Sequence, residues 1–288
     1  MNKKQSIFDL HIAMRVYPGV SKSPFIFPGD KFRLFKTGIY SLRNSLKGIN
    51  YKITFIMDNC PDRYDEVVKE VFGETQHLQI VTVKKSGNAN TFLKQIEVLL
   101  EKDDSDVLML AEDDYLYTGE SLKLLINLLQ AKIADFVTPY DHSDYYTLLI
   151  HKKNMPEIRF NQKIFKSVNS TCLTFLTTRK ILIAAQAVFK SYLRNNSDAS
   201  IFWSLTKEHV LSPVSFFKFL LEALHGNDQF LRLFVKAWIY SPIQNIFGKK
   251  YKILTPQPSF ATHMEKDSLS PGFDWDKIAS KLVEEYNI

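Results

Sequence analysis

The sequence has little of what stabilises small secreted proteins or membrane-spanning ones. Its 288 residues contain only two cysteines, Cys60 and Cys172, which lie far apart and show no metal-ligand spacing. A disulfide framework is therefore not expected, and a reducing compartment is the default. No run of about 18 apolar residues occurs, so we expect no transmembrane helix. The N-terminus leads into an apolar stretch broken by Asp9, His11 and Arg15, which predicts a first strand and not a signal peptide.

Several motifs that identify enzyme classes are also missing. The chain has no P-loop, no Gly-x-Gly-x-x-Gly fingerprint, no Gly-x-Ser-x-Gly elbow and no Cys-x-x-Cys pair. Internal repeats, low-complexity tracts and linkers are absent as well, which favours one continuous domain. These absences narrow the range of functions only modestly.

What the chain does have is aromatic residues and a modest positive charge. It contains 22 Phe and 13 Tyr, which could serve core packing, sugar rings or membrane interfaces. Its 37 basic and 31 acidic residues give a formal net charge of +6, with Lys and Arg scattered along the sequence. This balance suits phosphates, nucleic acid or an anionic membrane surface without choosing among them. Nucleic-acid binding is poorly supported, because the basic residues form no dense stripe with interleaved aromatics.

Strand and helix patterns alternate through the first part of the chain. Apolar and β-branched runs predict strands at 8–17, 52–57, 78–83 and 106–111. Helical spacing of apolar residues predicts helices between them at 30–46, 64–72 and 91–101. Such alternation predicts an α/β fold with a mostly parallel sheet. The carboxyl ends of parallel strands form the ligand crevice, so Asp58 and the acids at 112–114 should share one edge of the sheet.

The pattern loosens after residue 120. Strands are predicted at 134–139, 170–177 and 251–254, and helices at 122–129 and 179–192. A helical pair is predicted over 216–239, broken near 225–228. This pair mixes apolar and cationic residues and could lie on an anionic membrane and present a lipid-linked acceptor. An ordinary amphipathic core helix pair explains the same pattern.

Three successive acids, Glu112, Asp113 and Asp114, follow the apolar run at 106–111. They would repel one another unless water or a cation neutralised them. Carboxylate oxygens suit Mg²⁺ or Mn²⁺, which bridge protein carboxylates and substrate phosphates. A solvated acidic turn is the alternative explanation, but the preceding buried strand favours a site.

With these residues the chain resembles the nucleotide-sugar glycosyltransferases of the GT-A fold, particularly the family-2-like branch. In that family a short acidic motif, usually Asp-x-Asp, ends a strand in mid-domain and holds the metal on the donor diphosphate. The resemblance implies Asp114 as the main metal ligand, with Glu112 standing where the usual first Asp would be. It also implies that Asp113 or Glu112 could contact ribose or sugar hydroxyls of the donor.

The resemblance extends to segments upstream of the acids. The first strand, which carries Arg15, resembles the family's first strand, whose end meets the nucleotide. The second resembles the strand whose terminal acid, here Asp58, contacts the base. The turn at 86–90 resembles the Asn/Gly-rich turn into the third helix, which implies a donor-binding Asn88. Asn88 as a plain turn residue and Asn90 as a plain N-cap are the alternatives.

Two further resemblances lie downstream. The segment 195–203 resembles the acceptor-side segment whose acid, at a helix start, is the general base of inverting members; that acid is Asp198 here. Ser197 or Asp198 could instead be only a helix N-cap. His263, which follows a Pro-x-Pro frame, resembles the C-terminal histidine that GT-A enzymes return to the metal, although a lone His is often structural.

The resemblance thus implies a single GT-A-like domain with a mostly parallel sheet, flanking helices and a C-terminal helical segment. Its parts would be a nucleotide-sugar-binding half at about 1–130, an acceptor half at about 131–210, the helical segment at about 211–250 and a strand and tail at about 251–288. The cofactor would be Mn²⁺ or Mg²⁺.

The implied activity is transfer of one sugar from a nucleotide-sugar to a glycan or lipid-linked saccharide, in cell-surface polysaccharide or glycoconjugate synthesis. Inversion is favoured, and the absent Gln-x-x-Arg-Trp signature argues for single-sugar addition. We expect a cytoplasmic protein, with peripheral contact at the inner face of the membrane left open. A sugar nucleotidyltransferase and a non-catalytic sugar-binding protein of the same fold remain alternatives.

Overall fold

The computed structural model describes residues 6–19, 22–119, 121–148 and 156–288. The strands of its main sheet are β1 (Leu10–Val16), β2 (Tyr51–Asp58), β3 (Leu78–Val83), β4 (Val107–Glu112), β6 (Phe136–Val137), β7 (Glu157–Phe160), β8 (Lys163–Val168), β9 (Phe175–Thr178) and β10 (Ile253–Gln257). A small second sheet pairs β5 (Tyr115–Tyr117) with β11 (Ala261–His263).

The helices follow the order expected for an α/β protein. They are α1 (Lys31–Ser45), α2 (Asp62–Phe72), α3 (Gly87–Glu101), α4 (Leu122–Gln130), α5 (Asp144–Thr147), α6 (Arg179–Phe189), α7 (Asp198–Thr206), α8 (Pro213–Leu224), α9 (Gln229–Tyr240), α10 (Pro242–Phe247) and α11 (Trp275–Tyr286). A 3-10 segment, Lys190–Arg194, leads from α6 toward α7.

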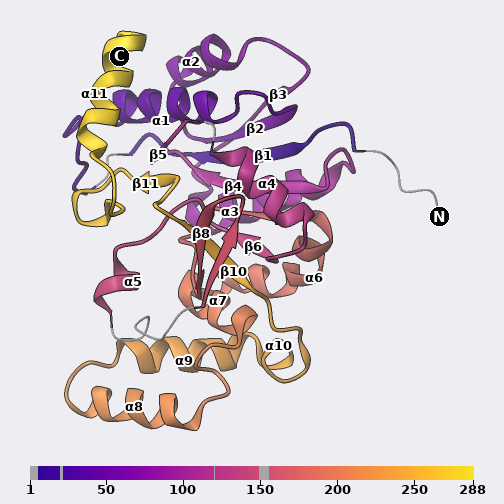
Figure 1. The fold of residues 1–288 in the computed structure, drawn as a ribbon, viewed down its shortest axis with the longest axis vertical. Helices are drawn as coiled ribbons and strands as arrows, with labels where there is room; N and C mark the ends of the chain where they lie inside the picture. Colours follow the sequence, from indigo (N-terminus) through magenta and orange to yellow (C-terminus); the bar gives the residue numbers. More distant parts are fainter. Residues whose placement is uncertain (1–5, 20–21, 120, 149–155) are drawn as a thin grey trace.

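The main sheet is mostly parallel, as the strand–helix alternation predicts. Its strand order is β3-β2-β1-β4-β9-β6-β10-β8-β7, and all strands except β8 and β9 run in one direction (Figure 1). β1 lies between β2 and β4, with Arg15 beside Ile56 on one side and beside Glu112 on the other. The carboxyl ends of these three strands therefore share one edge.

Helices cover both faces of the sheet. Alternate residues of β1, such as Ile12 and Met14, join one core with α1, α2 and α4. Ala13 points the other way, into a second core that includes residues of α3, α6 and α7. Strands buried on both faces read as continuous apolar runs, which is why 106–111 was recognisable in the sequence.

Aromatic side chains fill the second core. The Phe136 ring lies 5.6 Å from the rings of Phe175 and Tyr251 and 6.1 Å from those of Phe189 and Phe202, measured between centroids. All five side chains are buried. Part of the phenylalanine excess therefore serves packing, and Phe202 ties α7 to the sheet.

The helical segment near the C-terminus is confirmed. α8 and α9 form the predicted pair, which breaks between Leu224 and Gln229, and α10 follows at the same end of the molecule (Figure 1). In the described part of the chain, no helix is both long and apolar enough to cross a bilayer.

Some elements differ from the sequence prediction. The strand predicted at 134–139 is only Phe136–Val137, and the one predicted at 170–177 begins at Phe175. α3 begins at Gly87 and not at residue 91, with Ser86 in place of Asn90 at its N-cap position. β5, β11 and the β7–β8 hairpin were not predicted, since short strands that depend on distant partners leave little periodicity.

Replacing Phe136 with Ala should lower the free energy of unfolding by about 3–5 kcal/mol, because the change leaves a cavity among four other rings. Urea denaturation followed by circular dichroism measures the loss. Phe247→Ala is the matched control: that ring is 82% exposed, so its removal should change stability by less than about 0.5 kcal/mol. Equal losses for the two variants would show that Phe136 is not a core anchor.

Candidate functional site

The acidic residues lie where β4 turns into β5. Glu112 is the last residue of β4, and Asp113 and Asp114 form the turn. β11 runs antiparallel to β5 and pairs His263 with Tyr115, while the Met264 amide donates to the Asp114 carbonyl at 2.8 Å. The small sheet is therefore what carries His263 to the acidic turn.

Each of the three acids has its own cationic partner. Arg15 on β1 pairs with Glu112, its register partner on β4. Lys31, the first residue of α1, donates to Asp113 over 2.9 Å. The His263 Nε2 atom lies 3.2 Å from an Asp114 carboxylate oxygen. Side chains of the protein therefore offset the charge of all three acids at the end of this buried strand.

The electrostatics of the three pairs differ. Burial raises the pKa of Glu112 and of Asp113, against the opposing effect of Arg15 and Lys31. Burial also opposes ionisation of Asp114, but the neighbouring His263 holds the pKa of Asp114 well below its usual range. Burial disfavours the charged imidazole of His263, yet Asp114 outweighs this and raises the pKa of His263. Asp114 is thus the acid held most firmly as a carboxylate.

A pocket of about 870 Å³ opens at this edge of the sheet. Its lining includes the predicted residues Arg15, Asp58, Asn88, Glu112, Asp113 and Asp114. Three lysines that the sequence analysis had not singled out, Lys22, Lys31 and Lys85, line it as well. The pocket therefore combines carboxylates with cations at the carboxyl ends of β1, β2 and β4, where an α/β sheet binds its ligand.

Asp58 shapes this pocket through the backbone. Its two carboxylate oxygens accept from the amides of Ser86 at 3.0 Å and Gly87 at 2.9 Å. Gly87, with a φ of +74°, opens α3 immediately afterwards. The Asp58 carboxylate thus fixes the turn before α3 and holds the N-terminus of this helix at the pocket.

Asn88 connects the two sides of the site. Its carbonyl oxygen accepts from Arg15 at 3.0 Å, and its side-chain amide donates to the Tyr192 hydroxyl at 3.0 Å. Arg15 in turn pairs with Glu112. Asn88 is therefore more than a plain turn residue, because it links β1 and α3 to the 3-10 segment that precedes α7.

Asp198 begins α7, as predicted, but it is not the N-cap. Ser197 caps the helix and forms a capping box with Ser200. Burial raises the pKa of Asp198, against the Ala199 amide and His142, which favour the carboxylate. Asp198 is not among the pocket-lining residues, but its charge is felt by Cys172, Tyr192 and His142. With capping assigned to Ser197, the Asp198 carboxylate is available for another role.

His142 is a further histidine near the site, and the charges of Asp144, His263 and Asp198 act on its imidazole. Its Nδ1 atom accepts from the Asp144 amide at 2.9 Å, and its ring contacts Tyr140 with centroids 5.0 Å apart. Burial lowers the pKa of His142, so the neutral ring is favoured. The imidazole therefore adds a polar, uncharged group that feels the charges of both Asp198 and His263.

The acidic turn offers a divalent metal two donors and no larger cluster among the described residues. Across the described ranges, no group of three or more His, Cys, Asp or Glu side chains is arranged to hold one. Two donors do converge, Asp114 and His263, and the Asp114 Oδ1 atom is buried without a hydrogen-bond partner. Mg²⁺ characteristically takes one or two protein carboxylates and completes its shell with substrate phosphates and water. The Asp114 carboxylate fits that mode, and His263 would join it as a neutral imidazole after losing its proton. Glu112 is engaged by Arg15 and stays a predicted ligand.

Comparison with known proteins gives only distant similarity. No family model matches the chain, and no curated protein matches its sequence. The S. aureus TarS 1-349 structure has a TM-score of 0.42 and 12% identity, over 81% of this chain and 72% of that one. TarS 1-349 in complex with UDP-GlcNAc has a TM-score of 0.39 and 10% identity, over 70% of this chain and 53% of that one.

A 4-diphosphocytidyl-2C-methyl-D-erythritol synthase from Anaerococcus prevotii has a TM-score of 0.38 and 14% identity, over 67% of this chain and 80% of that one. A cytidylyltransferase from Leptospira borgpetersenii has a TM-score of 0.36 and 11% identity, over 63% of this chain and 64% of that one. Similarity at this level does not assign the chain to a family.

Replacing Lys31 with Met should lower the free energy of unfolding by about 3–5 kcal/mol, because Asp113 would keep its buried charge without the partner cation. A second change, Asp113→Leu, should recover much of this loss by removing the orphaned charge. Urea denaturation of the two single variants and the double variant measures the coupling.

Lys69→Met is the control for the loss of a lysine. Lys69 pairs with Glu74 at 3.7 Å on the exposed surface, so its removal should cost less than about 1 kcal/mol. A Lys31→Met variant as stable as Lys69→Met would mean that the buried pair does not hold the acidic turn in place.

Proposed function

We propose that the protein is a glycosyltransferase that moves one sugar from a nucleotide-sugar donor to a saccharide or lipid-linked saccharide. The observation that carries this proposal is the pocket at the ends of β1, β2 and β4, in which an acidic turn and several cations line one volume. A nucleotide-sugar needs both, because its diphosphate is anionic and its hydroxyls and base are hydrogen-bonding groups. A pocket of about 870 Å³ also has room for such a ligand.

Binding of the donor is assigned to the cationic and amide groups. Lys22 and Lys85 line the pocket outside the buried ion pairs and would contact the diphosphate. The N-terminus of α3, which Asp58 fixes, would offer backbone amides to the same group. Asp113 accepts the Tyr17 amide at 2.9 Å and so holds the end of β1, where the nucleotide would lie.

Asp114 and His263 would hold Mn²⁺ or Mg²⁺, whose positive charge would stabilise the departing nucleoside diphosphate. Arg15, paired with Glu112 and bonded to Asn88, would keep the acidic turn and α3 at a fixed separation. The protein's own groups thus orient the donor whether or not the cation is bound.

Asp198 is proposed as the general base. Its carboxylate would take the proton of the acceptor hydroxyl while the hydroxyl oxygen forms a bond to the anomeric carbon. The bond from that carbon to the diphosphate oxygen would break, and the electron pair would leave with the nucleotide. The burial that raises the pKa of Asp198 would improve it as a base, and the opposite faces of attack and departure would give inversion.

A panel of nucleotide-sugars with Mn²⁺, Mg²⁺ or EDTA should reveal a donor by raised melting temperature and by slow hydrolysis to the nucleoside diphosphate. Asp114→Ala should abolish the metal-dependent part of the shift, because it removes the carboxylate that His263 contacts. Asp62→Ala, on the exposed start of α2, is the matched control and should behave like the parent protein.

Three outcomes would count against this proposal or a part of it. Full metal-dependent donor affinity in Asp114→Ala would remove Asp114 as a ligand. Pyrophosphate release from a nucleoside triphosphate and a sugar phosphate, without any effect of nucleotide-sugars, would assign a nucleotidyltransferase instead. Stabilisation by free sugars alone would indicate a sugar-binding protein.

Asp198→Asn should retain donor binding but lose transfer by at least about 100-fold, since the amide cannot accept the proton. In the parent protein, transfer should fall as the pH drops through the pKa of Asp198, which burial raises above the ordinary aspartate value of about 3.9. The measurement is the rate of transfer against pH at saturating donor.

Ser197→Ala is the control for this change. It removes the α7 cap, at a cost of about 1 kcal/mol in stability, but leaves the carboxylate in place. Near-normal transfer in Asp198→Asn, or an equal loss in both variants, would remove Asp198 as the base.

A further inference from the structure

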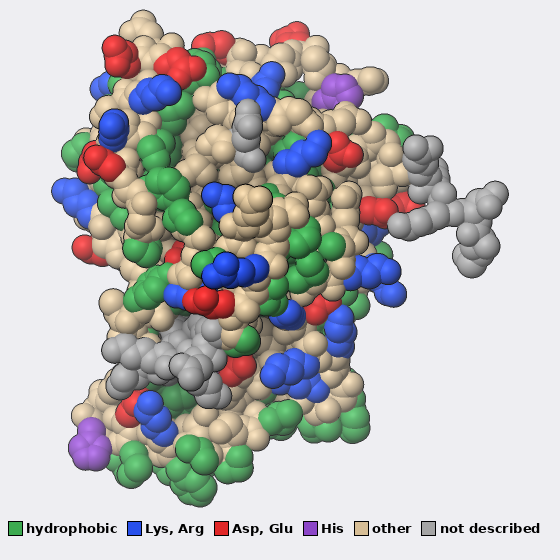
Figure 2. Space-filling view, viewed as in Figure 1, with side chains coloured by type: hydrophobic (Ala, Val, Ile, Leu, Met, Phe, Trp, Pro, Cys, Tyr) green, Lys and Arg blue, Asp and Glu red, His purple; other side chains and the backbone are tan. Residues whose placement is uncertain are grey.

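The layer formed by α8, α9 and α10 carries most of the large apolar side chains that the described part of the chain exposes. Of sixteen such residues, ten lie between positions 211 and 247. They are Leu211, Val214, Phe217, Leu221, Leu224, Val235, Ile239, Ile243, Ile246 and Phe247. Figure 2 shows apolar surface gathered along the lower edge of the molecule, over α8 and α10. Scattered exposed apolar residues are ordinary, but a contiguous patch marks an interaction surface.

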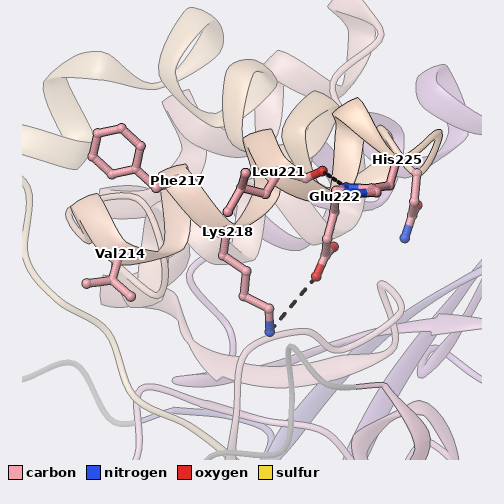
Figure 3. Close-up of a pocket in the computed structure, with 7 residues that line it drawn as sticks. Val214, Phe217, Lys218, Leu221, Glu222 and His225 are labelled. Carbon is pink, nitrogen blue, oxygen red and sulfur yellow. Dashed lines mark hydrogen bonds and ion pairs between the residues drawn. The ribbon is translucent and has the colours of Figure 1, made fainter.

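On α8 these side chains form a stripe. Val214, Phe217, Leu221 and Leu224 follow one another at intervals of three or four residues, the spacing of one helix face. Three of them, together with Lys218, line an open pocket of about 630 Å³ (Figure 3). Phe217 is 61% exposed and Leu221 58% exposed, so this face does not pack on the protein.

The opposite face of α8, together with α9, packs against the rest of the protein. Phe219 is buried and stacks on Trp203 of α7 with ring centroids 5.6 Å apart. Phe230 of α9 packs against Phe219 at 5.8 Å. An amphipathic core pair would have one apolar face, directed inward. α8 is apolar on both sides, and only the inner side is explained by the fold.

Charge indicates what would cover the outer face. Residues 211–250 contain five basic residues and two acidic ones, a net charge of +3 out of the +6 of the whole chain. The two acids are matched within their helices by Lys218 and Arg232, at 4.0 Å and 2.5 Å. Lys250 is exposed beside Lys249, which pairs with Asp135. A second copy docking by the same face would bring like charges together, whereas an anionic lipid surface would complement them.

The length of α8 and α9 determines how these helices would be oriented on a membrane. α8 and α9 have 12 residues each, which is well short of the roughly 20 needed to cross a bilayer. Short helices with apolar side chains on one face and lysines beside them lie in the plane of the interface. Phe217, Ile243 and Phe247 are the side chains that would enter the acyl boundary.

We propose that the outer face of α8–α10 binds the surface of a membrane that contains anionic lipid. The position of this face relates it to the candidate site: α9 packs on α7, and the Lys236 ammonium donates to the Asn195 carbonyl at 2.8 Å, just before Asp198. A bilayer held by this layer would lie on the acceptor side of the molecule. The membrane contact rests on the surface alone and does not require the proposed transfer reaction.

The test is flotation of the full chain with vesicles of phosphatidylcholine alone and of phosphatidylcholine with 40% phosphatidylglycerol. The protein should float with the anionic vesicles, float much less with the neutral ones, and bind more weakly as salt is raised. The triple variant Phe217→Ser/Leu221→Ser/Phe247→Ser should partition at least about tenfold more weakly, because it removes the largest inserted groups.

The matched control replaces three exposed apolar residues elsewhere, Ile7→Ser/Ile183→Ser/Phe273→Ser, and should float like the parent chain. Circular dichroism and donor-induced thermal shifts check that both triple variants are folded. Equal flotation with neutral and anionic vesicles, or equal loss in both triple variants, would overturn the proposal. So would absence of flotation combined with a dimer, seen by sedimentation, that the α8–α10 variant abolishes; that result would assign the face to a second copy.

Discussion

The neutralisation of three adjacent carboxylates is the constraint on which the rest of this structure depends. Glu112, Asp113 and Asp114 end a strand buried on both faces, where isolated charges are expensive. Each is matched by a cation from a different element: β1, α1 and β11. The order of strands, the capped start of α1 and the return of the chain at β11 all serve to bring those cations to one turn.

The residues of the site are therefore also residues of the central sheet and of the helix packed on it. Arg15 lies on β1, directly beside Glu112 in register, so the pairing of β1 with β4 holds the two residues next to each other. Gly38 lets α1 pass close behind the turn, since a Cβ there would lie 3.0 Å from the Tyr115 carbonyl oxygen. The Asp114–His263 pair, by contrast, depends on the short β5–β11 sheet. It is the pair that a ligand could most readily reorganise, which agrees with its proposed role.

Much of the site's position could be predicted from sequence because parallel strands converge at one edge. Once strands ending near Arg15, Asp58 and Glu112 were recognised, their proximity followed from topology. Lys31 could not be identified in this way. It looks like any lysine at a helix start, and its burial against Asp113 depends on how α1 crosses the sheet. Adjacent acids in a sequence reveal a charge to be neutralised but not the groups that do so, and the pairing of Arg15 and Lys31 with these acids therefore emerged only in three dimensions.

Asp198 was predicted from the resemblance of segment 195–203 to the acceptor-side segment of GT-A enzymes, and the capping alternative was separable only in three dimensions. Ser197 and Asp198 are both good N-cap residues, and propensity does not rank them. The extended backbone of Ser197, with a ψ of 156°, and its bond to the Ser200 amide settle which one caps the helix. The short strand β11 was missed for a related reason: its pairing partner, β5, lies far away in the sequence.

The donor side and the acceptor side of the proposed cleft are packed differently in the fold. The donor side stands on β1, β2 and β4, which are buried on both faces and paired along their length. The acceptor side is formed by α7. Its Phe202 packs in the core against Phe136, and its Trp203 packs against Phe219 of the α8–α9 layer. That layer exposes its far face and buries few of its own side chains, whereas residues 200–206 of α7 are all buried. Regions with fewer buried contacts open at lower free energy, and the acceptor side should therefore be the more adaptable one. A surface that covers the outer face of α8–α10 would then stabilise α7 indirectly, and with it the position of Asp198.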